Sequence, residues 1–203
     1  MKRLIIIGAS AMGRETCVYA QDCGMKVKGF IDSRSWILDK FTNYPPILGS
    51  VNEYLPSDED VFVCAIGEPD QKRKYVTIIE QKGGVFVSVI HPSSYVCKSV
   101  TLGKGCIVCP NATITNDSEI GSHVILNVNA SINHDNHIGD YATICPGCHL
   151  AGRVKVGTGA FVGTGTVIIP DITLGDGVFV AAGATVVKSY ASGRLMGTPA
   201  RQV

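Results

Sequence analysis

The spacing of hydrophobic residues changes near residue 90, and the two parts of the chain predict different structures. Before this point, apolar runs alternate with helix-like stretches at 12–22 and 70–81. This alternation is typical of β-α-β units, in which helices cover parallel strands. We therefore expect residues 1–92 to form a small Rossmann-like α/β domain with an irregular connection at 36–55. Its predicted strands are 4–7, 27–32, 60–67 and 85–90.

From Val96 to Val186, every sixth residue is Leu, Ile or Val, without a single insertion. A glycine follows the aliphatic residue in every third repeat: Gly103, Gly121, Gly139, Gly157 and Gly175. This pattern predicts a parallel β-helix, in which three hexapeptides make one triangular coil and residues n and n + 18 stack roughly 4.8 Å apart. We expect residues 93–203 to form such a β-helix, with about five coils and a C-terminal cap.

The residue before each aliphatic position should point outward, so stacking sorts the outward side chains into three columns. One column is largely apolar: Ile107, Ile125, Thr143, Phe161 and Phe179. A contiguous apolar stripe usually marks an interface. We therefore expect this face to pack against another subunit, and the three-sided coil favours a cyclic trimer.

Charge and composition narrow the possible partners. The chain has 18 Lys and Arg against 17 Asp and Glu, so its net charge is +1. Near neutrality without a basic run argues against nucleic acid or an anionic membrane as the main partner. The first apolar run is too short for a secretory signal, and no later run could span a bilayer. We expect a cytoplasmic protein whose cysteines are free thiols.

Two CxxC pairs suggest a zinc site, but the coil register argues against one. Cys106 and Cys148 fall at inward positions, where a thiol acts as a small hydrophobic group. Cys109 and Cys145 share a column but lie two coils apart, roughly 9–10 Å. This separation suits neither a disulfide nor a four-thiolate metal site. We expect no metal.

Several motifs resemble those of the hexapeptide-repeat acyltransferases that join a nucleotide-sugar-binding α/β domain to a left-handed β-helix. They are Gly-Ala-Ser-Ala-Met-Gly at 8–13, Asn127, Ile-Asn-His-Asp at 132–135 and Gly-Thr-Pro-Ala at 197–200. The set is similar to sugar N-acetyltransferases of bacillosamine-type and perosamine-type pathways, with sialic acid O-acetyltransferases as near relatives. The resemblance implies acetyl transfer from acetyl-CoA to a nucleotide-linked 4-amino-4,6-dideoxy sugar. It also implies a homotrimer with its site at the subunit interface.

The same resemblance implies roles for individual residues. His134 would be the general base, Asp135 its carboxylate neighbour, and Asn127 a contact near the acceptor. Contacts to the nucleotide sugar would come from Ser10, Ala11, Met12, Asp32, Ser33 and Gly67. Contacts to acetyl-CoA would come from Thr143, Gly152, Thr164, Ala182 and Lys188. The sequence departs from the family at Ala11 and Met12, where relatives have glycine and histidine, and at Thr143, where they often have histidine.

The coil register supports the catalytic assignment independently, because Gly152 follows His134 by 18 residues and should lie one coil further along. Acetyl transfer needs a base that works near neutrality, and histidine, with an ordinary pKa of about 6.5, suits this role. It also needs a donor to the oxyanion, which a closely approached glycine N–H supplies. We expect the other histidines, His91, His123, His137 and His149, to be ordinary surface residues. A zinc carbonic anhydrase would need three convergent histidines, which this register does not provide.

Two further functions remain open at the level of sequence. The first is acetylation of a sugar hydroxyl, as on sialic acid, which amine and hydroxyl acceptors would distinguish. The second is a non-catalytic scaffold that binds nucleotide sugars through its first domain. Absence of CoA binding would favour the scaffold.

Overall fold

The first apolar run forms a central strand of a four-stranded parallel sheet. In the computed structural model, which describes residues 2–203, the strand order is β2-β1-β3-β4. The strands are β1 (Arg3–Ile7), β2 (Val27–Ile31), β3 (Asp60–Cys64) and β4 (Val85–Phe86). Side chains alternate between the two sides of a strand, and both sides of β1 are buried. This explains why Leu4 to Ile7 form a continuous apolar run.

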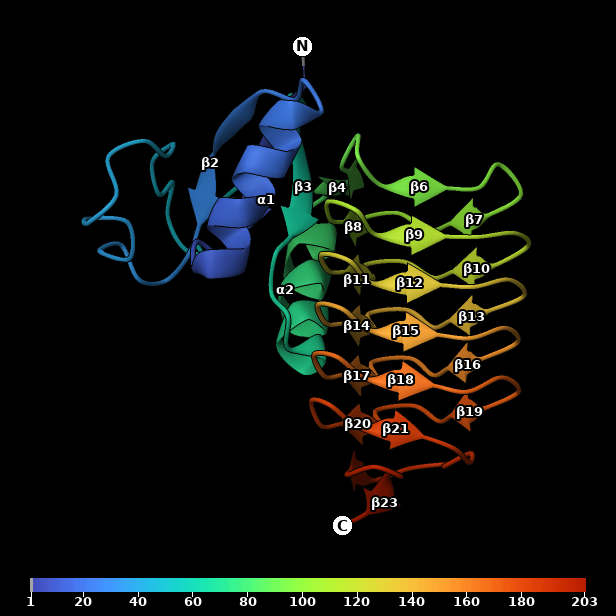
Figure 1. Cartoon of the computed structure of the whole chain (residues 1–203). Coiled ribbons are helices and arrows are strands. Elements are labelled where there is room, and N and C mark those ends of the chain that lie inside the picture. Colours follow the sequence, from blue (N-terminus) through green and yellow to red (C-terminus); the bar gives the residue numbers. More distant parts are fainter. Residues whose placement is uncertain (1) are drawn as a thin grey trace.

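One helix covers each side of this sheet. Helix α1 (Ala11–Asp22) packs on the side of Ile6, and α2 (Pro69–Gln81) packs on the side of Ile5 and Ile7. The N-cap Glu68 starts α2 by accepting hydrogen bonds from the backbone N–H groups of Asp70 and Gln71. The segment between β2 and β3 is irregular apart from short turns and an isolated bridge, and it extends away from the β-helix (Figure 1).

The remaining strands form the three sides of a left-handed β-helix (Figure 1). The eight-stranded sheet comprises β5 (Val89–Ile90), β8 (Ile107–Val108), β11 (Ile125–Leu126), β14 (Thr143–Ile144), β17 (Phe161–Val162), β20 (Phe179–Val180), β22 (Arg194–Met196) and β23 (Arg201–Gln202). The six-stranded sheet comprises β6 (Tyr95–Val96), β9 (Thr113–Ile114), β12 (Ser131–Ile132), β15 (His149–Leu150), β18 (Val167–Ile168) and β21 (Thr185–Val186). The five-stranded sheet comprises β7 (Thr101–Leu102), β10 (Glu119–Ile120), β13 (His137–Ile138), β16 (Lys155–Val156) and β19 (Thr173–Leu174).

Strand pairing confirms the predicted register. Glu119 pairs with His137, and Ser131 pairs with His149, so stacked residues are 18 apart. The aliphatic positions of successive coils form one continuous core along the β-helix. The β-helix is longer than the roughly five coils expected, because β5 precedes and β22 follows the predicted repeat of Val96 to Val186, each pairing in parallel with the neighbouring coil. The predicted strand 85–90 is split, since β4 pairs with β3 and β5 pairs with β8.

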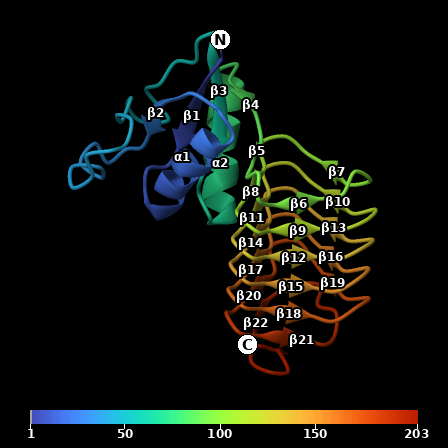
Figure 2. The same cartoon turned by 45° about the horizontal axis from the view of Figure 1, so that its top comes forward.

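The N-terminal domain covers the upper part of the eight-stranded sheet, and its helices α1 and α2 lie beside that sheet (Figure 2). Ile107 and Ile125 are buried in one cluster with Cys17 and Ala20 of α1. The expectation that this column packs wholly against another subunit is therefore corrected, because the same chain covers its first three positions. Lower in the column, Phe161 and Phe179 stay partly exposed and stack with ring centroids 5.2 Å apart.

Across residues 2–203, no helix has both the length and the apolar character required to cross a membrane.

Candidate functional site

The predicted site residues of the β-helix lie on two different edges. The edge between the eight-stranded and six-stranded sheets carries Asn127, which follows β11; we call it the Asn127 edge. The edge between the six-stranded and five-stranded sheets carries His134, which follows β12; we call it the His134 edge. The N-terminal domain lies beside the first edge, whereas the loops of the second project on the far side of the β-helix (Figure 1).

The His134 edge brings together three of the predicted residues. His134 Nδ1 lies 2.7 Å from Asp135 Oδ2, and both side chains are about half exposed. Because an ionised carboxylate only accepts hydrogen bonds, this contact favours, in the neutral ring, the tautomer with its proton on Nδ1 and its lone pair on Nε2. The register prediction for Gly152 is confirmed, since a Cβ added there would lie 2.6 Å from Nε2 of His134.

Glycine at this corner therefore leaves the His134 ring room to lie against the backbone. The carbonyl of Gly152 accepts a hydrogen bond from the N–H of Asp171, and the N–H of Arg153 donates to the carbonyl of His134. Within residues 2–203, the N–H of Gly152 has no hydrogen-bond acceptor. The ring of His134 thus lies against the backbone of Gly152, whose N–H has no acceptor within the described residues.

The Asn127 edge lies against the first turn of the N-terminal domain. Asn127 Nδ2 lies 3.9 Å from the sulfur of Met12, at the start of α1. Ser10 is the N-cap residue of α1, but its side chain makes no capping hydrogen bond. The N-terminus of α1 therefore keeps free donors, as a phosphate-binding helix does. Met12 and Asn127, both expected to contact the sugar substrate, thus lie side by side within one chain.

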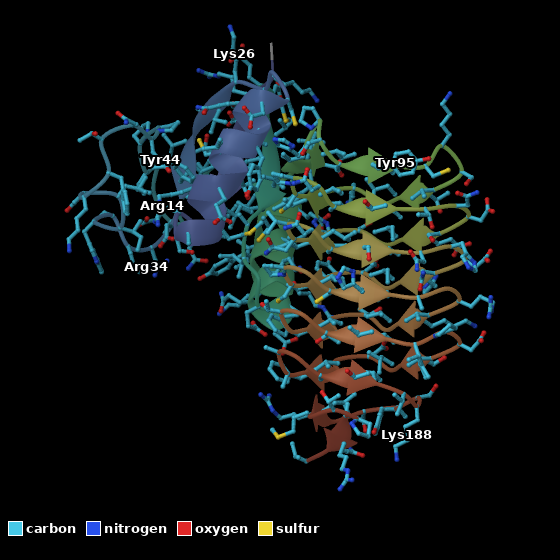
Figure 3. All side chains as sticks on the ribbon, viewed as in Figure 1. Arg14, Lys26, Arg34, Tyr44, Tyr95 and Lys188 are labelled. Atoms are coloured by element: carbon cyan, nitrogen blue, oxygen red, sulfur yellow. The ribbon has the colours of Figure 1, made fainter. Side chains whose placement is uncertain are left out.

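A cavity of about 210 Å³ opens at the carboxyl ends of the strands in the N-terminal domain. Asp32 and Ser33 line it, together with Arg34, Gln71 and Tyr75. Gly67 does not line this cavity, but its neighbour Ile66 does. Ala11 lines a separate hollow on the outer side of α1, with Arg14 and Tyr44. Figure 3 shows Arg14, Arg34 and Tyr44 on the part of the domain remote from the β-helix.

The sequence analysis missed Arg34, which fixes the Asp32 carboxylate. Arg34 donates to it from Nε at 3.0 Å and from Nη2 at 2.9 Å, and the Ala9 N–H donates at 3.0 Å. Burial alone would raise the pKa of Asp32, but these hydrogen bonds outweigh it and hold the pKa below its ordinary value. The carboxylate is therefore ionised at neutral pH. The Asp-Ser-Arg spacing at the end of β2 was the available signal for this pair.

Thr143, which the resemblance predicts to contact CoA, is buried within the chain. Its side chain is only 2% exposed, because α2 covers it. The hydroxyl donates to the carbonyl of Gly67 at 2.7 Å and accepts from Lys72 Nζ at 2.9 Å. Thr143 thus joins the two domains within one chain. Burial lowers the pKa of Lys72 to about 8.

Three other residues predicted to contact CoA, Thr164, Ala182 and Lys188, are exposed but do not share an edge. Thr164 and Ala182 are exposed on the Asn127 edge, following β17 and β20. Lys188 follows β21 on the His134 edge, near the C-terminal end of the β-helix (Figure 3). One chain therefore does not bring all of them together.

Three of the other histidines have partners at the surface, as expected: His91 with Asp22, His137 with Glu119, and His149 with Ser131. The expectation for His123 is wrong, because it is 1% exposed and neither ring nitrogen has a hydrogen-bond partner. Its ring stacks on Tyr141 and meets the edge of Phe86. It is buried because β4 of the N-terminal domain covers its corner.

The cysteines lie where the register places them. Cys106 and Cys148 are fully buried, and all eight cysteines are free thiols. In residues 2–203, no group of three or more His, Cys, Asp or Glu side chains is arranged to hold a metal ion.

Comparisons with known proteins place both parts of the chain. Residues 3–79 match the PglD N-terminal domain family, and residues 153–188 match the bacterial transferase hexapeptide family. PerB from Caulobacter crescentus, solved with CoA and GDP-perosamine, is 30% identical, with TM-score 0.91, and the match covers 100% of this chain and 98% of PerB. The acetyltransferase domain of PglB from Neisseria gonorrhoeae is 26% identical with TM-score 0.92, covering 100% of both chains. WeeI from Acinetobacter baumannii is 27% identical with TM-score 0.85, also covering 100% of both chains.

A search of curated proteins gave no match. The fold and the structural relatives define an acetyltransferase of the hexapeptide-repeat class. More narrowly, the chain belongs to the family of PerB and the PglB acetyltransferase domain, in which a PglD-type N-terminal domain precedes the β-helix.

Proposed function

We propose that the protein transfers the acetyl group of acetyl-CoA to the amine of a nucleotide-linked 4-amino-4,6-dideoxy sugar. The observation that carries this proposal is the His134 edge, where the imidazole contacts the Asp135 carboxylate through Nδ1 and lies against the backbone of Gly152. The relative PerB, solved with CoA and GDP-perosamine, supports an amino-sugar acceptor. The cavity with Asp32 and Ser33 is a suitable place for the nucleotide, because ligands of parallel α/β sheets bind at the carboxyl ends of the strands.

In the proposed reaction, the neutral amine of the sugar attacks the thioester carbon of acetyl-CoA. His134 Nε2 accepts the proton that the amine loses, while Asp135 stabilises the ring cation through Nδ1–H. The N–H of Gly152 donates to the carbonyl oxygen as it becomes an oxyanion. Collapse of the intermediate breaks the C–S bond, and His134 returns the proton to the CoA sulfur. The products are an amide and free CoA.

The separation of the two edges supports a site formed by more than one copy of the chain. Both edges border the six-stranded sheet, but Asn127 and Met12 lie on one and His134 on the other. If this sheet faces the axis of a cyclic trimer, the His134 edge of one subunit meets the Asn127 edge of the next. Thr164 and Ala182 of one subunit and Lys188 of its neighbour then border one groove for acetyl-CoA. We therefore propose a homotrimer with three sites between subunits.

Replacement of the proposed base tests the reaction. We expect His134→Ala to lower kcat/KM at least about 100-fold, since general-base catalysis contributes about 10²–10⁴-fold. Unchanged CoA binding and unchanged thermal stability would show that the loss is chemical, because the side chain is exposed. Retention of most of the wild-type kcat/KM would refute the proposed role.

Mixed oligomers test the shared site. His134→Ala and Met12→Asp alter different edges, so each homo-oligomer should be inactive. In a mixture refolded at equal ratio, some sites combine a normal His134 edge with a normal Asn127 edge, and activity should return to about a quarter of wild type. A mixture as inactive as its parents would argue against a site shared between subunits.

A further inference from the structure

The His134 edge carries a column of charged residues beside the proposed catalytic pair. Asp117, Asp135, Arg153 and Asp171 occupy equivalent corner positions 18 residues apart, all with left-handed backbone (φ 56, 58, 58 and 64°). The flanking strands pair with the same shift of 18, so these corners stack coil upon coil. Arg153 therefore stands between two carboxylates, with Asp135 one coil before it and Asp171 one coil after it.

Arg153 is paired with Asp171 and not with Asp135. Its Nε donates to Asp171 Oδ1 at 2.6 Å, and its Nη2 donates to Oδ2 at 2.9 Å. The contact raises the pKa of Arg153 and lowers the pKa of Asp171; the charge of Asp135 also contributes to raising the pKa of Arg153. The guanidinium thus interacts with both carboxylates but is held by one. Asp135 remains available to His134.

We propose that Arg153 and Asp171 are positioning residues that set the charge around the His134–Asp135 pair. Asp171 holds the guanidinium away from Asp135, and Arg153 offsets the repulsion among the three carboxylates of the column. This inference rests on the proposed function of His134. Without Asp171, the neighbouring carboxylate of the column is Asp135. The Arg153 guanidinium would then compete with the protonated His134 ring for that carboxylate. Without Arg153, the ring cation would face carboxylates alone.

Asp135 also lines a shallow hollow with the charged or titratable side chains of Asp117, Glu119, His137 and Lys155. His137 Nδ1 is 3.1 Å from Glu119 Oε2, so these two side chains largely satisfy one another. Substitutions at Arg153 and Asp171 leave all of these groups in place. Opposite effects of the two substitutions would therefore come from the charges of the pair itself.

The test is the pH dependence of kcat/KM for Asp171→Asn and Arg153→Gln at low ionic strength. We expect the acidic limb to move to lower pH in Asp171→Asn and to higher pH in Arg153→Gln, each by about 0.2–0.7 pH unit, as is usual for exposed charges. The double variant should lie near wild type. About 0.5 M salt should remove most of the differences. Glu59→Gln is the matched control, because it breaks the exposed Arg3–Glu59 pair in the N-terminal domain and should change nothing.

Shifts in the same direction, or no shift in either variant, would overturn the inference, since a merely structural role does not reverse sign with charge. NMR titration of the His134 ring in the substrate-free protein separates this inference from the proposed function. Opposite movements of its midpoint support the electrostatic role even if His134→Ala proves active. An unmoved midpoint in both variants refutes that role even if His134 proves essential.

Discussion

Gly152→Ala tests the geometry of the His134 edge with the smallest possible change. The added Cβ would lie 2.6 Å from Nε2 of His134, whereas ordinary contacts begin near 3.4 Å. The exposed ring can give way more easily than the backbone of the coil, so it should move by most of an ångström. A displacement of about 1 Å at a reacting group costs on the order of 100-fold in rate. The variant should therefore lose about 100-fold in kcat.

The stability of Gly152→Ala should remain close to wild type, because the clash is with an exposed side chain and Gly152 does not have a left-handed backbone. Thiol release from acetyl-CoA measures the rate, and thermal denaturation measures the stability. Gly177→Ala is the control: its φ of 64° makes it strained, but its Cβ meets no atom within 4 Å. A Gly152→Ala enzyme with wild-type kcat would refute the proposed arrangement of base and N–H donor.

Two further predictions concern the contact between the domains. Burial lowers the pKa of Lys72 to about 8, so at pH 7 the folded protein carries a buried ammonium, which costs roughly 3 kcal/mol. Lys72→Met should therefore raise the free energy of unfolding by about 1–3 kcal/mol, measured by urea denaturation at pH 7. A lower free energy of unfolding would contradict this prediction, because it would show that the hydrogen bonds of Lys72 to Ala142 and Thr143 stabilise the protein by more than burial of the ammonium costs. Burial likewise lowers the pKa of His123 from 6.5 to about 4. The unfolded chain therefore protonates His123 more readily than the folded chain does. The free energy of unfolding should be highest above pH 6.5 and should fall by up to about 3 kcal/mol toward pH 4. His123→Phe should flatten this dependence, and an equally steep curve would exclude His123 as its cause.

The sequence predicted the β-helix and the His134–Gly152 contact because both follow from the period alone. The 18-residue coil determines which residues stack, independently of the contacts that the rest of the chain makes. The alternation of apolar and helical segments predicted the α/β domain in the same way, since both sides of β1 are buried.

The contact between the domains could not be derived from periodicity. The apolar column showed where an interface lies but not that α1 and α2 of the same chain occupy it. Lys72 lies in a helix whose pattern predicts mostly exposed polar residues, yet its ammonium meets the hydroxyl of Thr143 across the interface. That contact gives the threonine a role within the chain, distinct from the CoA contact expected of a family histidine. His123 is buried for the same reason.

The most direct test of the proposed reaction is thiol release from acetyl-CoA with a panel of UDP-, dTDP- and GDP-linked 4-amino sugars, with sialic acid as the hydroxyl acceptor. The proposal predicts turnover with at least one amino sugar, loss of that turnover in His134→Ala, and none with sialic acid. Turnover with sialic acid alone would establish O-acetylation instead. No turnover with any acceptor, together with no binding of CoA, would contradict an enzymatic role.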